Sequence, residues 1–293
     1  MGRPLGQHFL FQASILERIA AAACPPGAPL CIEIGPGPGG LTRLLLERCQ
    51  HLVAVELDPV LAAALRTEFA SEPRFELVEA DVLATNLGRW GPAAVCGNLP
   101  YYITSPIIDQ VLSLPPGTLT QAVFLVQREV ADRLAAQPGS RDYGYLSVAT
   151  QVRCRVERLF IVKPSSFRPP PKVDSAVVRL TPHPQPLTED LPAFLKFASA
   201  CFRQKRKTLR NNLMGVYDKA RVDALPEAGL RAEQLSISQL IALHRSVCPT
   251  PSATLVVQWF EFDSLPLPPA TSTLEAPARS SLTGSSPAGR RGP

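Results

Sequence analysis

The chain has 293 residues, of which 45% are hydrophobic, and it carries a formal net charge of +5. This length predicts one large domain or two smaller ones with a sizeable core. No run of about 18 apolar residues occurs, so we expect no transmembrane helix. The seven cysteines include no C-x-x-C pair, which predicts reduced thiols in a cytoplasmic protein and no metal site.

Strand-like and helix-like segments alternate along the first half of the chain. The expected helices cover residues 12–23, 41–49, 59–69, 105–114 and 128–137, and the expected strands cover residues 30–34, 51–56, 75–81, 92–98 and 121–127. Such alternation predicts an α/β fold with a parallel, doubly wound sheet.

The pattern changes after about residue 143. Residues 152–162 and 172–182 are expected to form two strands without a helix between them, which predicts an antiparallel pair at the sheet edge. We therefore expect a catalytic domain over residues 1–183 and a small helical domain over residues 187–257. Residues 264–293 are rich in Pro, Ser, Thr, Gly and Ala, which predicts a disordered tail.

A glycine-rich turn, "EIGPGPGGLT", follows the first of these strands. Gly35 and Gly37 allow a ligand to approach the backbone closely, and the next helix offers free N–H groups. Glu56 ends the second strand, where a carboxylate can accept hydrogen bonds from both hydroxyls of a ribose. On these features alone, a nicotinamide cofactor and S-adenosylmethionine (SAM) remain alternatives.

Two further polar residues favour SAM. Asp81 follows the third strand, where its carboxylate can meet an adenine amino group, and Asn98 follows the fourth. Because ligands in open α/β sheets bind at the carboxyl ends of strands, we expect these side chains to surround one ligand. Taken singly, each residue is better explained as a cap or turn residue, and only the set with this spacing favours a ligand site.

The stretch "NLPYY" combines an amide, a proline and two aromatic residues. The Asn98 side-chain oxygen and the Leu99 carbonyl could accept the two protons of an adenine amine and direct its lone pair toward a methyl donor. Tyr101 offers a face on which an extruded base can stack. The alternative is that Tyr101 and Tyr102 are core aromatic residues.

A basic segment, "FRQKRKTLRNN", lies in the helical region. Its cations are Arg203, Lys205, Arg206, Lys207 and Arg210, with no acid among them. Such a cluster is typical of phosphate binding, and its alternative is a solvated helix face.

Together these motifs resemble a known family, the small-subunit ribosomal RNA adenine dimethyltransferases. The resemblance is carried by "GQHFL", "EIGPGPGGLT", "VAVELDP", "GNLPYYITSPI", "FRPPPKVDSAVVRL" and "FRQKRKTLRNNL", and it extends over residues 3–250. It implies a Rossmann-like SAM-dependent methyltransferase sheet with an antiparallel edge strand and a small C-terminal all-helical domain. It also implies dimethylation of two adjacent adenines in the 3′-terminal hairpin loop of 16S rRNA, on an immature small ribosomal subunit, by a monomer.

The resemblance also assigns individual residues. The implied SAM-binding residues are His8, Leu10, Gly35, Glu56, Asp81 and Asn98, and the implied catalytic residues are Asn98, Tyr101 and Phe167. Many family members have Asn where this chain has His8. The alternative for Phe167 is a buried loop anchor.

Three other functions are open at this stage. A 23S rRNA adenine methyltransferase of the antibiotic-resistance type shares the fold and the N-x-P-Y motif. A non-catalytic nucleic-acid-binding factor would have no need of Gly35, Glu56, Asp81 and Asn98. A dehydrogenase would bind a nicotinamide cofactor at the same strand ends.

Overall fold

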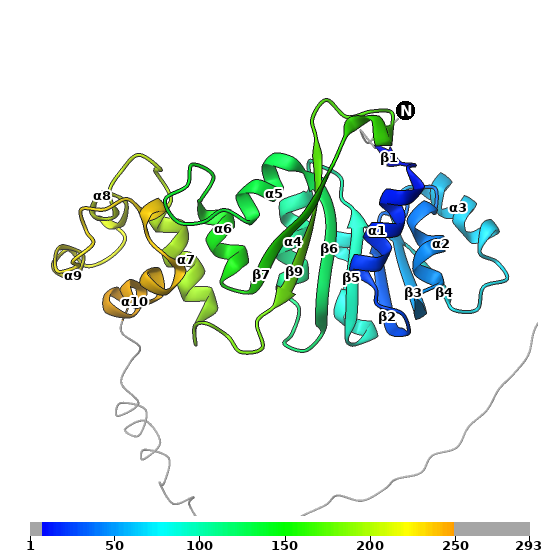
Figure 1. Cartoon of the computed structure of the whole chain (residues 1–293). Coiled ribbons are helices and arrows are strands. Elements are labelled where there is room, and N and C mark those ends of the chain that lie inside the picture. The colour runs from blue at the N-terminus through cyan, green and yellow to red at the C-terminus, as the bar shows by residue number, and fades with distance from the viewer. Residues whose placement is uncertain (1–7, 249–293) are drawn as a thin grey trace, which may run out of the picture. The chain divides into compact units, whose positions relative to one another are not determined.

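The computed structural model describes residues 8–248 of the chain. Its centre is a seven-stranded sheet in the order β4-β3-β2-β5-β6-β9-β7 (Figure 1). The strands are β2 (Ala28–Ile34), β3 (Cys49–Glu56), β4 (Phe75–Glu79), β5 (Ala93–Asn98), β6 (Leu119–Gln127), β7 (Cys154–Val162) and β9 (Ser175–Pro182). Strands β2 to β6 are parallel, and β9 runs antiparallel to both β6 and β7. The predicted parallel sheet with an antiparallel edge is therefore confirmed.

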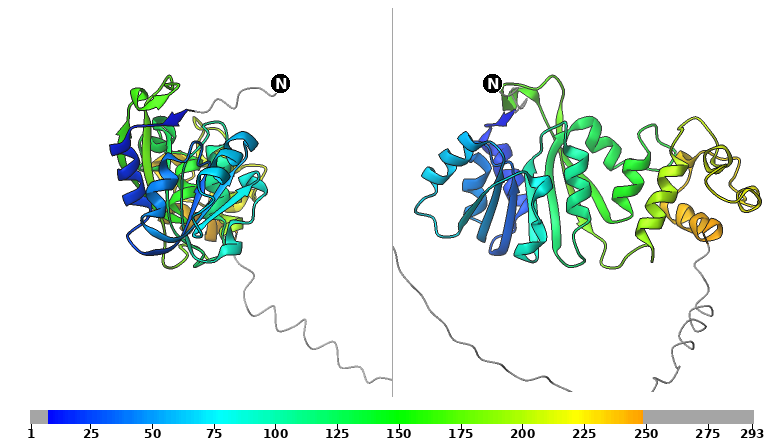
Figure 2. Two further views of the ribbon diagram at one scale, coloured as in Figure 1. Left: turned by 90° about the vertical axis from the view of Figure 1, so that its right-hand side faces the viewer. Right: turned by 180° about the vertical axis from the view of Figure 1, so that it is seen from behind.

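Helices cover both faces of this sheet. On one face lie α1 (Ala13–Ala23) and α2 (Gly40–Leu46). Helix α3 (Pro59–Glu68) packs next to β3 and β4. On the other face lie α4 (Thr104–Leu112) and α5 (Arg128–Leu134), which Figure 2 shows from behind. Helix α2 ends three residues earlier than expected, because Cys49 already belongs to β3.

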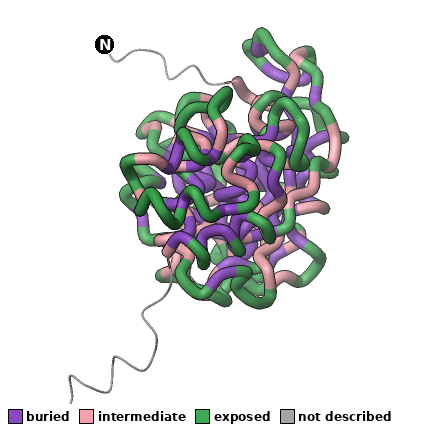
Figure 3. Tube along the Cα trace, turned by 90° about the vertical axis from the view of Figure 1, so that its left-hand side faces the viewer, coloured by how far each residue is buried: buried purple, intermediate pink, exposed green. Residues whose placement is uncertain are grey.

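The strand residues alternate between two hydrophobic cores. In β2, Leu30, Ile32 and Ile34 face the core beneath α4 and α5, whereas Cys31 faces the core beneath α1 and α2. Figure 3 shows the buried stretches inside and the exposed loops around them. Strands that are buried on both faces read as nearly continuous apolar runs, which is why they could be found in the sequence.

A second sheet of two short strands was not predicted. Strand β1 (Phe9–Leu10) pairs antiparallel with β8 (Phe167–Arg168), which follows the short 3₁₀ helix η3 (Pro164–Ser166). The pair joins segments that are about 160 residues apart in the sequence, so no local pattern announces it. It holds the N-terminal segment next to the loop between β7 and β9.

The helical region has a core of its own. It contains α7 (Leu191–Cys201), α8 (Leu209–Leu213), α9 (Lys219–Asp223) and α10 (Ile237–Val247), packed around Phe194 and Phe197. Helix α6 (Tyr145–Gln151), which the sequence did not suggest, contributes Val148 to the same core. The division at residues 183–187 stays a prediction. The expected tail, 264–293, and the end of the expected helical domain, 249–257, lie outside the described residues.

Candidate active site

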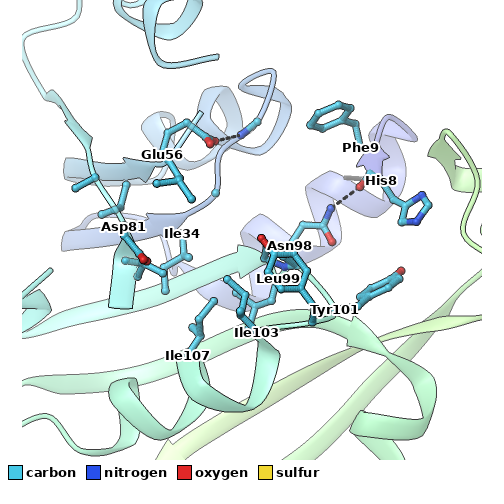
Figure 4. A pocket seen from close by; sticks show the side chains of 18 residues that line it. His8, Phe9, Ile34, Glu56, Asp81, Asn98, Leu99, Tyr101, Ile103 and Ile107 are labelled. Carbon is cyan, nitrogen blue, oxygen red and sulfur yellow. Dashed lines mark hydrogen bonds between the residues drawn. The ribbon is translucent and has the colours of Figure 1, made fainter. Parts of the chain in front are cut away.

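A cavity opens at the carboxyl ends of β2, β3 and β5, where the parallel strands were expected to present their ligand-binding residues. Figure 4 shows Glu56 and Asp81 toward one end of it and Asn98 and Tyr101 toward the other. The lining also includes residues from the N-terminal segment and from the glycine-rich turn: His8, Phe9, Gly35 and Gly37. The chain therefore brings most of the predicted site residues together around one space.

The glycine-rich turn requires its glycines. Gly35 and Gly37 have φ of +63° and +58°, in the left-handed region that favours glycine. A Cβ atom on Gly37 would lie 3.1 Å from the ring of Phe9. The ring of Phe9 thus packs directly on the turn, and the N-terminal segment covers part of the cavity.

The Glu56 carboxylate is buried and held by the backbone. Its Oε2 accepts a hydrogen bond from the Gly37 N–H at 3.1 Å, and its Oε1 accepts one from the Asp58 N–H at 2.9 Å. Each carboxylate oxygen can accept more than one hydrogen bond, so both retain capacity for a ligand. Glu56 therefore fixes the turn and still presents acceptors to the cavity.

Asp81 is a capping residue that also lines the cavity. One carboxylate oxygen, Oδ1, accepts the Leu83 N–H at 2.9 Å and caps the 3₁₀ helix η1 (Val82–Ala84). The residue is exposed and lines the cavity. The cap fixes the carboxylate, and its second oxygen remains available to a ligand donor.

The Asn98 amide has a defined orientation. Its Nδ2 donates to the backbone carbonyl of His8 at 2.8 Å, as the dashed line in Figure 4 marks. Within residues 8–248, neither Asn98 Oδ1 nor the Leu99 carbonyl accepts a protein hydrogen bond. Both residues line the cavity. Two acceptors are therefore left for a donor that enters it.

Tyr101 is anchored beside Asn98. Its hydroxyl shares a hydrogen bond of 2.8 Å with Ser175 Oγ, and burial raises the pKa of the phenol. The ring is half-buried and lies with its centroid 5.7 Å from that of His8. Tyr101 therefore lines the cavity as a fixed aromatic surface.

The His8 side chain is turned toward this aromatic side of the cavity. Its Nδ1 donates to the carbonyl of Pro169 at 2.8 Å. The residue thus uses its backbone oxygen to hold Asn98 and its ring to hold the loop after β8. These contacts explain how the N-terminal segment is fixed over the site.

A second cavity lies on the other side of Phe9, between the glycine-rich turn and helices α1 and α2. Glu33 is buried at its base, where Oε2 accepts the Thr42 hydroxyl at 2.7 Å. Burial raises the pKa of the Glu33 carboxyl to about 7, and the nearby Glu56 carboxylate also raises it, against the effect of the Thr42 hydrogen bond. Leu10 lines this second cavity and not the first.

Phe167 does not line either cavity in this structure. Its side chain is 2% exposed and belongs to the core beneath α1 and α2. This geometry favours a buried loop anchor, the alternative that the sequence left open, over a contact with a target base. The aromatic residues at the first cavity are instead Phe9, Tyr101 and Tyr102.

The basic segment, residues 202–212, forms the connection between α7 and α8 and continues into α8, where Arg210 lies. Two of its cations are paired with acids: Arg210 Nε lies 2.8 Å from Asp223, and Lys205 Nζ lies 3.7 Å from Glu233. These pairs are exposed, and exposed pairs are weak. They attach the segment to the rest of the helical region.

The loop itself is held by a buried amide. Asn212 Nδ2 donates to the backbone carbonyls of Cys201 and Gln204, at 2.8 and 3.1 Å. The backbone carbonyl of Asn212 accepts a hydrogen bond from Arg203 Nη2 at 3.3 Å. Arg206 and Lys207 are exposed and make no ion pair among the described residues. These two cations are therefore the ones most available to a polyanion.

Three residues important for the site were not singled out from the sequence. Phe9 and Ser175 act through contacts with distant segments, which leave no local signal. Gly97 did leave one, because a glycine inside a strand often marks close backbone approach. A Cβ at Gly97 would lie 2.3 Å from the Ile34 carbonyl oxygen, so only glycine fits here between β2 and β5.

Two negative findings apply to residues 8–248. No group of three His, Cys, Asp or Glu side chains is placed to hold a metal ion. In the same range, no helix has the length and apolar character needed to cross a bilayer.

Solved structures place this architecture in a class. A dimethyladenosine transferase from Plasmodium falciparum aligns with a TM-score of 0.73 and 26% identity, covering 80% of this chain and 96% of that one. The 23S rRNA methyltransferase ErmE aligns with a TM-score of 0.66 and 31% identity, covering 82% and 99%. The fold and the site therefore define a Rossmann-like methyltransferase with a helical C-terminal region.

Sequence comparisons narrow the class to a family. Residues 2–244 match the model of the family described as "Ribosomal RNA adenine dimethylase". "Ribosomal RNA small subunit methyltransferase A" of Acidobacterium capsulatum is 44% identical over 83% of this chain and 90% of its own length. The protein of that name from Pseudomonas putida is 42% identical over 81% and 91%. The chain belongs to the ribosomal RNA adenine dimethylase family and is an rRNA adenine dimethyltransferase.

Proposed function

We propose that this protein dimethylates the 6-amino groups of two adjacent adenosines in the 3′-terminal hairpin loop of 16S rRNA, with SAM as methyl donor. The substrate is the immature small ribosomal subunit in the cytoplasm, and the enzyme acts as a monomer. The proposal is supported by the curated small-subunit relatives at 40–44% identity. It is also supported by the arrangement of groups around the first cavity.

The charge of the first cavity favours SAM over a nicotinamide dinucleotide. Glu56 and Asp81 contribute two carboxylates, and no lysine or arginine occurs among the described residues that line it. Two carboxylates favour a sulfonium cation over an anionic pyrophosphate, which would have only the backbone N–H groups of the glycine-rich turn to offset the repulsion. We assign Glu56 to the ribose hydroxyls, Asp81 to the adenine amine, and Gly35 to the methionine part, with His8 and Leu10 in the segment above.

The single observation that carries the mechanism is the fixed amide of Asn98. Since His8 holds Nδ2, Oδ1 faces the cavity as an acceptor, and the Leu99 carbonyl provides another. When bound, SAM supplies an electrophilic methyl group. The two acceptors bind the protons of the target amine and direct its lone pair, and they stabilise the positive charge that develops on nitrogen. Tyr101 supports the extruded base by stacking.

The phosphate-binding role of the basic segment is part of this proposal. Arg206 and Lys207 have no acid partner among the described residues, and they are assigned to the RNA backbone together with Arg203, Lys205 and Arg210. A role for Phe167 at the target base would require it to leave its buried position. We therefore assign the base contact to Tyr101.

The second candidate is methylation of 23S rRNA, which the alignment with ErmE favours. The test is to incubate the purified protein and SAM with small and large subunits that lack adenine dimethylation. Methylated nucleosides are then mapped by mass spectrometry. We expect two adjacent dimethyladenosines at the 3′ end of 16S rRNA. Modification confined to 23S rRNA would favour the second candidate, and no modification of either would favour a non-catalytic RNA-binding factor.

A further inference from the structure

The loop after β8, residues 169–174 ("PPPKVD"), is attached at both ends to residues of the active site. At its start, the Pro169 carbonyl accepts the hydrogen bond from His8. Immediately after its end, Ser175 bonds the Tyr101 hydroxyl. This proline loop therefore lies alongside the part of the cavity where Tyr101 and Asn98 meet, and its position is coupled to theirs.

The proline loop is stiff. Pro169, Pro170 and Pro171 have fixed φ angles, and Pro171 is buried. Its far end is fixed as well, because the Asp174 carbonyl accepts the Arg128 N–H at 3.0 Å. A stiff loop with two fixed ends loses little entropy when it binds a ligand. It is thus suited to positioning.

Two exposed cations lie on or directly before this loop: Lys172 within it, and Arg168 at the end of β8. Arg168 and Lys172 are exposed, and neither forms an ion pair within residues 8–248. The Arg168 guanidinium lies over the ring of Phe11, 4.4 Å from its centroid. The one acid of the segment, Asp174, is already bonded by Lys163 at 2.9 Å. The two cations are therefore available to an anion, and Arg168 also lines the second cavity, which shares Phe9 with the first.

A base that enters the cavity brings its own phosphates to the rim. Extrusion rotates a nucleotide about its backbone, so the phosphates on either side stay close to the opening while the base moves inward. The basic segment lies in the helical region. The two hydrogen bonds described above, His8 to Pro169 and Tyr101 to Ser175, do not involve it. The proline loop is the cationic element attached to His8 and Tyr101.

We propose that Lys172 and Arg168 hold the phosphates of the RNA strand that flanks the target adenosine, and so position the extruded base over Tyr101. This inference rests on the proposed function, since it takes RNA as the substrate. It adds a contact surface separate from the basic segment. Lys172 and Arg168 are positioning residues, and the chemistry stays with the groups around Asn98.

The test compares Lys172→Ala with wild type for binding to small subunits that lack the modification, over a range of salt concentrations. One lost phosphate contact on single-stranded RNA should reduce the slope of log affinity against log salt by about 0.7. The affinity defect should accordingly shrink by about 2.5-fold between 50 and 200 mM salt. Lys172→Arg should keep the wild-type slope.

The control is Arg155→Ala, which removes an exposed cation that is paired with Glu157 at 2.9 Å. Arg155 lies near the start of β7, at the opposite end of that strand from the proline loop. A change of slope in Lys172→Ala alone supports the inference. Equal behaviour of Lys172→Ala, Arg155→Ala and wild type overturns it, provided that wild type methylates the same subunits. If wild type does not methylate them, the proposed function itself fails.

Discussion

The Asn98 amide is oriented by a backbone carbonyl that lies 90 positions earlier in the chain. Its place at the end of a strand could be predicted, because the apolar run before it and the proline after it are local signals. Its orientation could not, since that depends on where the His8 carbonyl lies in space. The same holds for Tyr101, whose anchor on Ser175 comes from a distant strand.

Replacing Glu56 should weaken SAM binding. In Glu56→Gln, the shape of the side chain and one acceptor remain, but the charge, one charge-assisted hydrogen bond to the ligand and one of the two bonds from the Gly37 and Asp58 N–H groups are lost. Such bonds contribute about 1.5–3 kcal/mol, so the dissociation constant should rise by at least about tenfold in calorimetric titrations. The melting temperature serves as the control for folding. An unchanged dissociation constant would contradict the ribose assignment.

Glu33 should make stability depend on pH. Because its folded-state pKa is raised to about 7, the stability associated with the neutral form is present below the ordinary pKa of 4.5 and is lost as the pH rises through 7. Ionisation of Glu33 above pH 7 therefore destabilises the fold, by about 3 kcal/mol at most. Glu33→Gln mimics the neutral form.

This variant should accordingly unfold at the same urea concentration as wild type near pH 4.5 and at a higher one at pH 8. Thr42→Val is the companion variant, since it removes the hydroxyl that bonds the Glu33 carboxylate. It should be less stable than wild type at pH 8. A pH-independent difference between Glu33→Gln and wild type would refute the assignment of the raised pKa.

At the scale of elements, the central strands and the helices on the sheet were predictable, since buried parallel strands read as apolar runs between turn residues. The short strands β1 and β8 were not, because two residues carry no periodicity. Helix α6 was also missed. Its seven residues, including Ser147 and Thr150, lack a clear apolar stripe, and packing against the helical core stabilises it.

Gly97→Ala should disrupt the contact of β2 with β5. The new methyl group would lie 2.3 Å from the Ile34 carbonyl oxygen, so the two strands would have to separate. Overpacking of this kind costs about 1–3 kcal/mol, which urea denaturation would detect. Gly144→Ala is the matched control, because its Cβ would meet nothing within 4 Å. Equal stability of the two variants would contradict the close approach.

At the scale of the whole molecule, the catalytic fold and the family were readable from motifs that span most of the chain. The domain division and the state of the tail stay predictions. The function of the basic segment depends on which of its cations are free, and this could not be read from the sequence. Asp223 and Glu233 neutralise two of them from later in the chain.

Reversing the charge of Arg206 and Lys207 should weaken binding to small subunits without changing SAM affinity. The salt slope should fall by about 0.7–0.9 for each lost contact. Filter binding at several salt concentrations measures this. The control replaces Arg89 and Arg155 with Glu; these are exposed cations outside the basic segment, paired with Glu76 and Glu157. If the Arg206/Lys207 variant binds small subunits as tightly as the Arg89/Arg155 variant does, the basic segment is only a solvated surface.

The central claim is that the Asn98 amide positions the target amine, and single-turnover methylation of small subunits tests it most directly. Asn98→Ala removes an acceptor that acts in the transition state, so the rate at saturating subunit should fall by about 10²–10³. Subunit affinity, measured in parallel, should stay near wild type, because phosphate contacts carry most of it. Tyr101→Ala, by contrast, should lose both rate and subunit affinity, because stacking on the base contributes about 1–3 kcal/mol to binding. Near-normal turnover by Asn98→Ala would contradict the account.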